Sequence, residues 1–65
     1  MATEFQQYGY RYQVRRKASV RDRDIWYECV VTSRPEQNGK PYGLGLGTIV
    51  LFNRSDILRL ARARI

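Results

Sequence analysis

The sequence of 65 residues contains no histidine, one cysteine and two prolines. Without histidine, and with Cys29 alone, the chain has no Cys/His zinc site and cannot close an internal disulfide. No run approaches the ~20 apolar residues of a membrane-spanning helix, and residues 1–10, which include Glu4, lack the apolar core of a signal peptide. We therefore expect a small cytoplasmic domain without metal, cofactor or membrane span, held by apolar packing alone or by a partner.

Signs of catalytic chemistry are also scarce. Cys29 falls among apolar residues of a predicted strand, where it is expected to be a small buried side chain and not a reactive thiol. The segment Gly43-Leu44-Gly45-Leu46-Gly47 contains Gly-x-Gly but lacks the spacing of nucleotide-binding loops. We expect that the protein is not an enzyme.

The positive charge consists mainly of arginine. Twelve basic residues against six acidic ones give a net charge of +6, and ten of the twelve are arginine. The planar arginine fork suits bidentate contacts to phosphate and guanine, whereas lysine serves general solubility equally well. The excess of positive charge favours an anionic partner, and double-stranded DNA is the partner it favours most. The alternative is a surface that is merely basic.

Side chains alternate between apolar and polar over residues 10–20, which predicts a half-buried strand with a basic outer face. Residues 1–9 have no apolar period and are expected to form a flexible arm. Residues 10–65 are then a single domain.

A hairpin is predicted between this strand and a second one over residues 25–33, closed by Arg21-Asp22-Arg23-Asp24. Pairing residues whose numbers sum to 45 places apolar residues opposite apolar ones and Lys17 opposite Glu28. Arg16 then falls on the core side. It either extends past the sheet edge or marks a bulge that returns it to the outer face.

Asn38-Gly39 predicts a type I′ turn, and hence a third strand in which Leu44 and Leu46 face the core. Residues 48–52 are compatible with an extension of that strand, a fourth strand, or the entry to a helix. Asn53 or Ser55 can cap a C-terminal helix. The expected fold is α+β: a three-stranded antiparallel sheet, with a possible fourth short strand, packed against one helix.

The uncovered face of this sheet would be basic and aromatic, and a narrow sheet can enter the major groove of DNA. There arginine reads guanine edges and glutamine pairs with adenine. The side chains expected to contact nucleic acid are Arg11, Gln13, Arg15, Lys17, Arg21, Arg23, Trp26, Thr32, Arg34 and Lys40.

Trp26-Tyr27-Glu28-Cys29, followed by Asn38-Gly39-Lys40-Pro41-Tyr42-Gly43-Leu44-Gly45, resembles the amino-terminal arm-binding domain of lambda-type phage tyrosine integrases. Leu46-Gly47-Thr48 is similar to the end of the third strand in the plant ethylene-response-factor DNA-binding domain, which shares that fold. The resemblance covers residues 10–47 and implies major-groove binding in phage or mobile-element recombination or regulation. The basic tail of that family has no counterpart here, since residues 1–10 contain neither arginine nor lysine.

Two other partners fit the same residues. Exposed aromatic side chains beside arginines can stack on the unpaired bases of RNA or single-stranded DNA. A small β-barrel-like adaptor could instead bind an acidic protein surface through the arginines.

Overall fold

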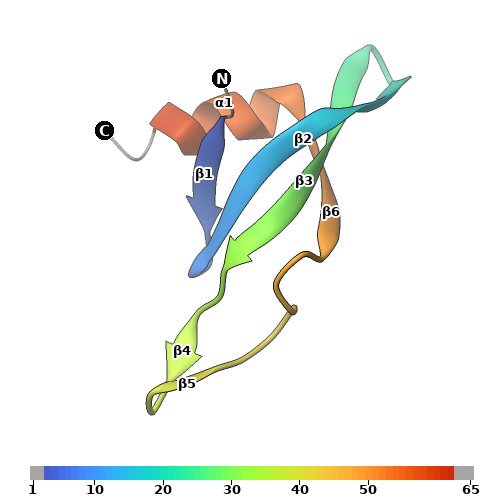
Figure 1. Cartoon of the computed structure of the whole chain (residues 1–65). Coiled ribbons are helices and arrows are strands. Elements are labelled where there is room, and N and C mark those ends of the chain that lie inside the picture. The colour runs from blue at the N-terminus through green and yellow to red at the C-terminus, as the bar shows by residue number, and fades with distance from the viewer. Residues whose placement is uncertain (1–2, 63–65) are drawn as a thin grey trace.

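The computed structural model describes residues 3–62 and has an α+β fold (Figure 1). The elements are β1 (Glu4–Gln7), β2 (Tyr10–Arg21), β3 (Asp24–Ser33), β4 (Glu36–Gln37), β5 (Lys40–Pro41), β6 (Ile49–Asn53) and α1 (Arg54–Arg62). Four strands form an antiparallel sheet in the order β1-β2-β3-β6, while β4 and β5 form a separate two-stranded ribbon. The expected fold class is confirmed, with β1 and β6 as additions to the predicted hairpin.

Strand β1 lies within the segment expected to be a flexible arm. It pairs with the start of β2, and Phe5 is completely buried. The Phe5 ring stacks on Tyr12 with centroids 5.3 Å apart and meets Phe52 edge-on at 4.9 Å. The expectation of a mobile arm is therefore wrong for residues 4–7, because a single aromatic side chain completes the core.

The β2–β3 hairpin has the predicted register at its tip, where Val20 pairs with Ile25. Asp22 and Arg23 form the turn with φ angles of 54° and 63°, as a type I′ turn requires. Away from the tip, bulges shift the register, and Lys17 lies opposite Tyr27. The predicted pairing of Lys17 with Glu28 is wrong.

The Asn38-Gly39 turn is also present, with φ angles of 55° and 78°, but its two strands are short. Beyond Pro41, the Tyr42 N–H still donates to the Pro35 carbonyl at 3.1 Å, but Pro35 has no N–H to return the bond, and the ribbon ends there. Leu44 and Leu46 are 43% and 66% exposed, so their predicted place in the core is wrong. The strand that pairs with β3 is instead β6, which overlaps residues 48–52, where a fourth strand was one of the alternatives, and extends to Asn53.

The glycine-rich loop between β5 and β6 is fastened to the sheet. The Tyr10 hydroxyl accepts a hydrogen bond of 2.8 Å from the Leu44 N–H. Gly43 has a φ of +81°, and a Cβ at this position would collide with that hydroxyl. Gly47 donates to the Val31 carbonyl at 2.9 Å. The glycines thus allow close approach of the loop to β2 and β3 instead of lining a strand.

Helix α1 begins directly after β6. The Asn53 side-chain oxygen accepts a 2.8 Å hydrogen bond from the Asp56 N–H, which identifies Asn53 as the N-cap. Ser55 is not the cap; its hydroxyl donates to Asp24 at 3.4 Å. Ile57 is buried against the aromatic cluster, with Leu60 and Ala61 beside it.

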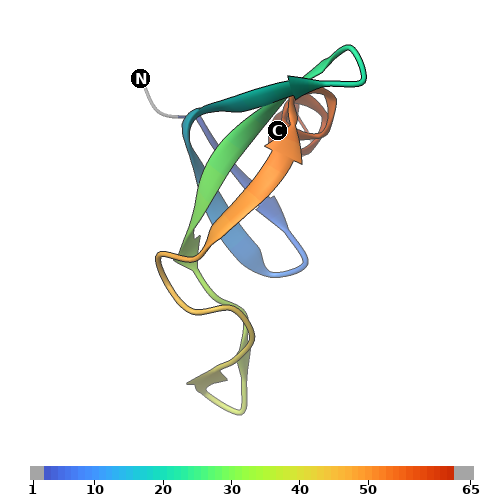
Figure 2. The same ribbon diagram turned by 90° about the vertical axis from the view of Figure 1, so that its right-hand side faces the viewer.

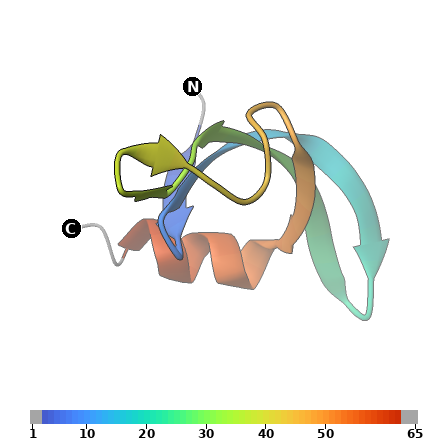
Figure 3. The ribbon, with the colours of Figure 1, turned by 90° about the horizontal axis from the view of Figure 1, so that it is seen from below.

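The sheet bends over α1, and the helix lies on its concave side (Figure 3). The buried side chains between them are Phe5, Tyr12, Cys29, Val31, Phe52 and Ile57. The opposite face of the sheet is convex, and no helix formed by residues 3–62 covers it. Figure 2 shows β6 at one side of the sheet, with the β4–β5 ribbon extending below.

Candidate nucleic-acid interface

A bulge in β2 determines which basic side chains share the convex face. Val14 pairs with Cys29 and Arg16 with Glu28, so Arg15 is an extra residue between two pairs. At a bulge, two consecutive residues oppose one on the partner strand, and the alternation of side chains is interrupted. A groove of about 320 Å³ results, lined by Arg15, Arg16, Glu28 and Ile49 and called the arginine groove below.

The two arginines in this groove have different environments. Arg16 Nε donates to Glu28 Oε1 at 3.0 Å and Arg16 Nη2 approaches Oε2 at 3.5 Å. The Arg16 side chain nevertheless remains 75% exposed, and such a pair contributes at most about 1 kcal/mol to stability. No side chain among residues 3–61 pairs with that of Arg15. Glu28 therefore orients one guanidinium while the other is free to bind.

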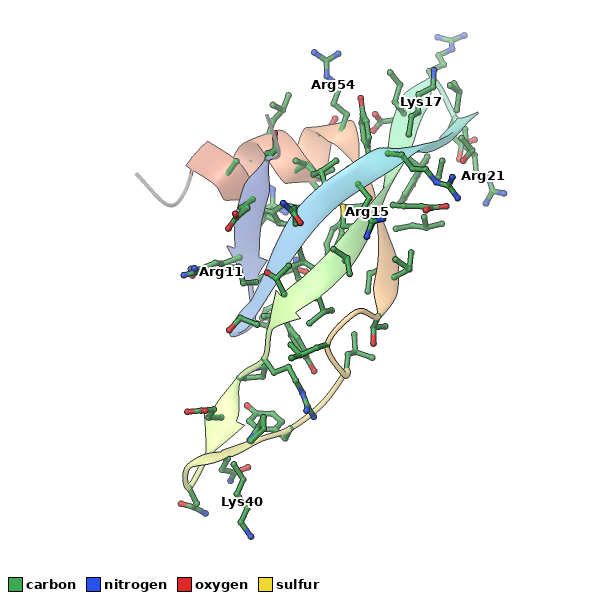
Figure 4. All side chains as sticks on the ribbon, in the orientation of Figure 1. Arg11, Arg15, Lys17, Arg21, Lys40 and Arg54 are labelled. Carbon is green, nitrogen blue, oxygen red and sulfur yellow. The ribbon has the colours of Figure 1, made fainter. Side chains whose placement is uncertain are left out.

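A smaller hollow of about 120 Å³ continues the face toward the hairpin tip and is lined by Ser19, Arg21, Trp26 and Leu51. Figure 4 shows Arg15 and Arg21 along the same side of β2. Trp26 is half-buried, and its indole N–H is buried without a hydrogen-bond partner among the described residues. Its ring is less available for stacking than the sequence suggested.

At the other end of β2, Arg11 and Gln13 flank the buried Tyr12 and so face away from the core. Gln13 lies opposite Glu4 of β1, and Arg11 extends outward past β1 in Figure 4. The main-chain carbonyl of Arg11 accepts a 3.3 Å hydrogen bond from the Thr32 hydroxyl. Thr32 thus contributes to the β2–β3 junction.

Four other residues expected at the site lie elsewhere. Lys17 lies opposite Tyr27, which packs against the core, so Lys17 is on the helix side of the sheet. Lys40 is on the β4–β5 ribbon, and Arg34, just before it, donates to the Gly43 carbonyl at 3.3 Å. Arg23 is in the β2–β3 turn.

The residue that sequence reasoning left out of the site is Arg16. Simple alternation puts it on the core side, where an unpaired guanidinium is too costly to bury. Three consecutive basic residues, Arg15-Arg16-Lys17, were the available signal, because no regular strand keeps all three out of the core. The bulge that the sequence offered as one of two solutions is the one observed.

Cys29 lies beneath this face, on the core side, and is completely buried. Burial raises the pKa of its thiol from 9.0 to about 11. Burial likewise raises the pKa of Tyr12, with a smaller contribution from the neighbouring Tyr10. A thiol held neutral and out of reach is a packing group and not a nucleophile.

This shift predicts alkaline destabilisation. The unfolded thiol loses its proton near pH 9 and the folded one only near pH 11, so the free energy of unfolding falls as the pH rises between these values. The slope expected from Cys29 is up to about 1.4 kcal/mol per pH unit. Urea unfolding of the wild type and of Cys29→Ala at pH 8 and pH 10.5 measures it. Cys29→Ala should lose less stability over that interval; equal losses in both chains would contradict the assignment.

Among residues 3–62, no group of three or more His, Cys, Asp or Glu side chains could hold a metal ion. In the same part of the chain, no helix has the length and apolar character needed to span a bilayer.

Comparisons of the chain with protein-family models, with curated proteins and with solved structures find no match.

Proposed function

We propose that this protein binds double-stranded DNA with the convex face of its sheet, and that the arginine groove provides the central contacts. The observation that carries the proposal is the bulge at Arg15, which places two consecutive arginines on one face. Arg21 extends the same face toward the hairpin tip. The net charge of +6 supplies the long-range attraction to phosphate.

The two guanidinium groups suit different parts of the duplex. Arg15 has no side-chain partner among residues 3–61, so its guanidinium is suited to binding a DNA phosphate. The guanidinium and the phosphate are both partly desolvated when they come into contact. Arg16 is held by Glu28 through Nε and Nη2, and its remaining N–H groups are directed by that pair. An arginine fixed in this way can read the O6 and N7 atoms of guanine.

The shape of the sheet favours a duplex over a single strand. A convex sheet fits the major groove of B-DNA, which is about 12 Å wide. Binding to unpaired bases depends on open aromatic surfaces, whereas Trp26 on the convex face is half-buried. The exposed Tyr8 and Tyr42 lie away from the arginine groove, in the β1–β2 turn and directly after β5. RNA or single-stranded DNA, and an acidic protein surface, are the competing outcomes of the experiment below.

The resemblance to integrase arm-binding domains implies a role in recombination or regulation of a phage or mobile element. Its glycine motif, which forms a strand in that family, lies in the loop between β5 and β6 here. The proposed DNA binding therefore rests on the arginine groove and not on that motif.

The experiment is a fluorescence-anisotropy titration of a random-sequence duplex, and of one of its single strands, at about 50 and 200 mM salt. Duplex affinity should fall by roughly tenfold or more over this range, as expected when at least two phosphate contacts release counterions. Arg15→Gln should reduce the slope of log affinity against log salt by about 1. Tighter binding to the single strand, or duplex affinity independent of salt, would contradict the proposal.

A further inference from the structure

Strand β6 is the edge of the sheet opposite β1, and no described strand pairs with its outer side (Figure 1). Its side chains alternate between the two faces. Val50 and the buried Phe52 face the core, whereas Ile49 and Leu51 face outward and are 51% and 52% exposed. The edge thus combines open backbone groups with large apolar side chains.

The direction of those backbone groups follows from the pairing with β3. The Val31 N–H donates to the Thr48 carbonyl at 3.0 Å. In an antiparallel pair the backbone groups of successive residues point alternately toward and away from the partner strand. Residues 48, 50 and 52 therefore point toward β3, and the N–H and C=O groups of Ile49 and Leu51 point outward.

The two edges of the sheet differ in how well they are protected from pairing with another strand. Natural edge strands are usually kept from pairing by charged side chains, prolines, bulges or short length. Strand β1 has four residues, which include Glu4, two glutamines and a single apolar residue, Phe5, that is buried. Strand β6 has no charge, no proline and no register shift. The whole segment 41–53 contains no charged residue, and Leu44 and Leu46 in it are exposed as well.

We propose that the β6 edge binds the β6 edge of a second copy of this chain, forming a continuous eight-stranded antiparallel sheet. Pairing residues whose numbers sum to 100 places Ile49 opposite Leu51 of the second copy and Val50 opposite its counterpart. Apolar side chains then face one another along the strand, and the outward backbone groups of Ile49 and Leu51 form hydrogen bonds across the twofold axis.

Electrostatics explain why a chain of charge +6 can pair with itself here. The segment 41–53 is uncharged, so pairing it with its own copy brings no like charges together. Arg15 and Arg16 are on β2, two strands from the edge, so five strand spacings separate them from the same residues of the second copy. That is about 24 Å, well beyond the Debye length of about 8 Å at physiological salt. Both arginine grooves then lie on one face of the joined sheet.

The test is sedimentation equilibrium of the full-length, nuclease-treated chain from about 1 μM to about 1 mM. A contact of one short strand belongs to the small, weak class of interfaces, so a concentration-dependent shift from monomer to dimer is expected within this range. Leu51→Lys should keep the chain monomeric throughout, because it places a charge beside its own counterpart. Leu58→Lys is the matched control: Leu58 is 47% exposed but lies on α1, and this variant should dimerise like the wild type.

Thermal melts by circular dichroism establish that both variants are folded. A wild-type monomer at about 1 mM, or loss of the dimer in Leu58→Lys with retention in Leu51→Lys, would overturn the proposal.

The register of the two β6 strands is tested separately, by disulfide formation between two cysteine variants. A mixture of Ile49→Cys and Leu51→Cys chains should form a disulfide between unlike chains on mild oxidation, since directly opposed residues are within disulfide reach. The buried Cys29 does not compete, and absence of the mixed disulfide would place any dimer contact elsewhere. No nucleic acid is present, so the result is independent of DNA binding.

Discussion

The Phe5→Ala chain is expected to lose a large part of its free energy of unfolding and to melt far below the wild type. A domain of this length has roughly 3–10 kcal/mol of stability, at about 0.05–0.15 kcal/mol per residue. Truncating a fully buried phenylalanine typically costs about 3–5 kcal/mol, because the lost transfer free energy is joined by that of the cavity. Phe5 has no exposed surface and contacts Tyr12 and Phe52, so little relaxation can refill its space.

Circular dichroism and thermal melting measure this effect directly. Tyr8→Ala is the matched control, because Tyr8 follows β1 closely and is 87% exposed. It should leave the melting temperature within a few degrees of the wild type. If Phe5→Ala melted cooperatively within a few degrees of Tyr8→Ala, β1 would contribute little to the core, and the expectation of a flexible arm would regain support.

Phe5 also illustrates which parts of the fold the sequence could predict. Local signals were sufficient for the two turns, because Asp22-Arg23 and Asn38-Gly39 adopt positive φ angles for reasons contained in a few residues. Strand β1 had no such signal. Four residues with one aromatic side chain show no period, and only the aromatic cluster formed with Tyr12 and Phe52 keeps them in place.

The third strand of the sheet could not be located from the turn alone. Asn38-Gly39 gave the correct local register, with Glu36 opposite Pro41, but a turn does not determine how far its ladder extends. Two contacts distant in sequence decide that outcome here. Tyr10 holds the loop at Leu44, and Val31 hydrogen-bonds to Thr48, so that β3 pairs with β6 beyond the loop.

The candidate site was predicted in part for a similar reason. Alternation correctly placed Arg11 and Gln13 away from the core, because the shift between Arg11 and Tyr12 adds its extra residue, Thr32, to β3, and the extra residues of β2 come only after Val14. From Arg15 onward each bulge changes the side to which the following residues point, so Arg16 joins the convex face and Lys17 leaves it. Bulge positions depend on which residues the partner strand directs toward the core, here the buried Cys29 and the partly buried Tyr27, and this information is not local to β2.

The largest functional effect is expected from reversing the charge at the centre of the proposed DNA-binding face and at its extension toward the hairpin tip. Arg15→Glu combined with Arg21→Glu lowers the net charge from +6 to +2 and replaces two phosphate contacts with two repulsions. Each phosphate contact removed reduces the salt slope by about 1, and each carboxylate opposes the duplex at short range. Duplex affinity at about 100 mM salt should fall by at least about 100-fold, a change of roughly 2.7 kcal/mol.

The matched control for this charge reversal is the double variant Lys17→Glu/Lys40→Glu. It has the same net charge of +2, but Lys17 is on the helix side of the sheet and Lys40 is on the β4–β5 ribbon. If binding depends on the arginine groove and its extension toward Arg21, the lysine variant should lose far less affinity, through the weaker long-range field alone. Equal losses in the two variants, measured by anisotropy with the same duplex, would mean that the protein attracts DNA through its total charge. The position of the bulge would then have no bearing on recognition.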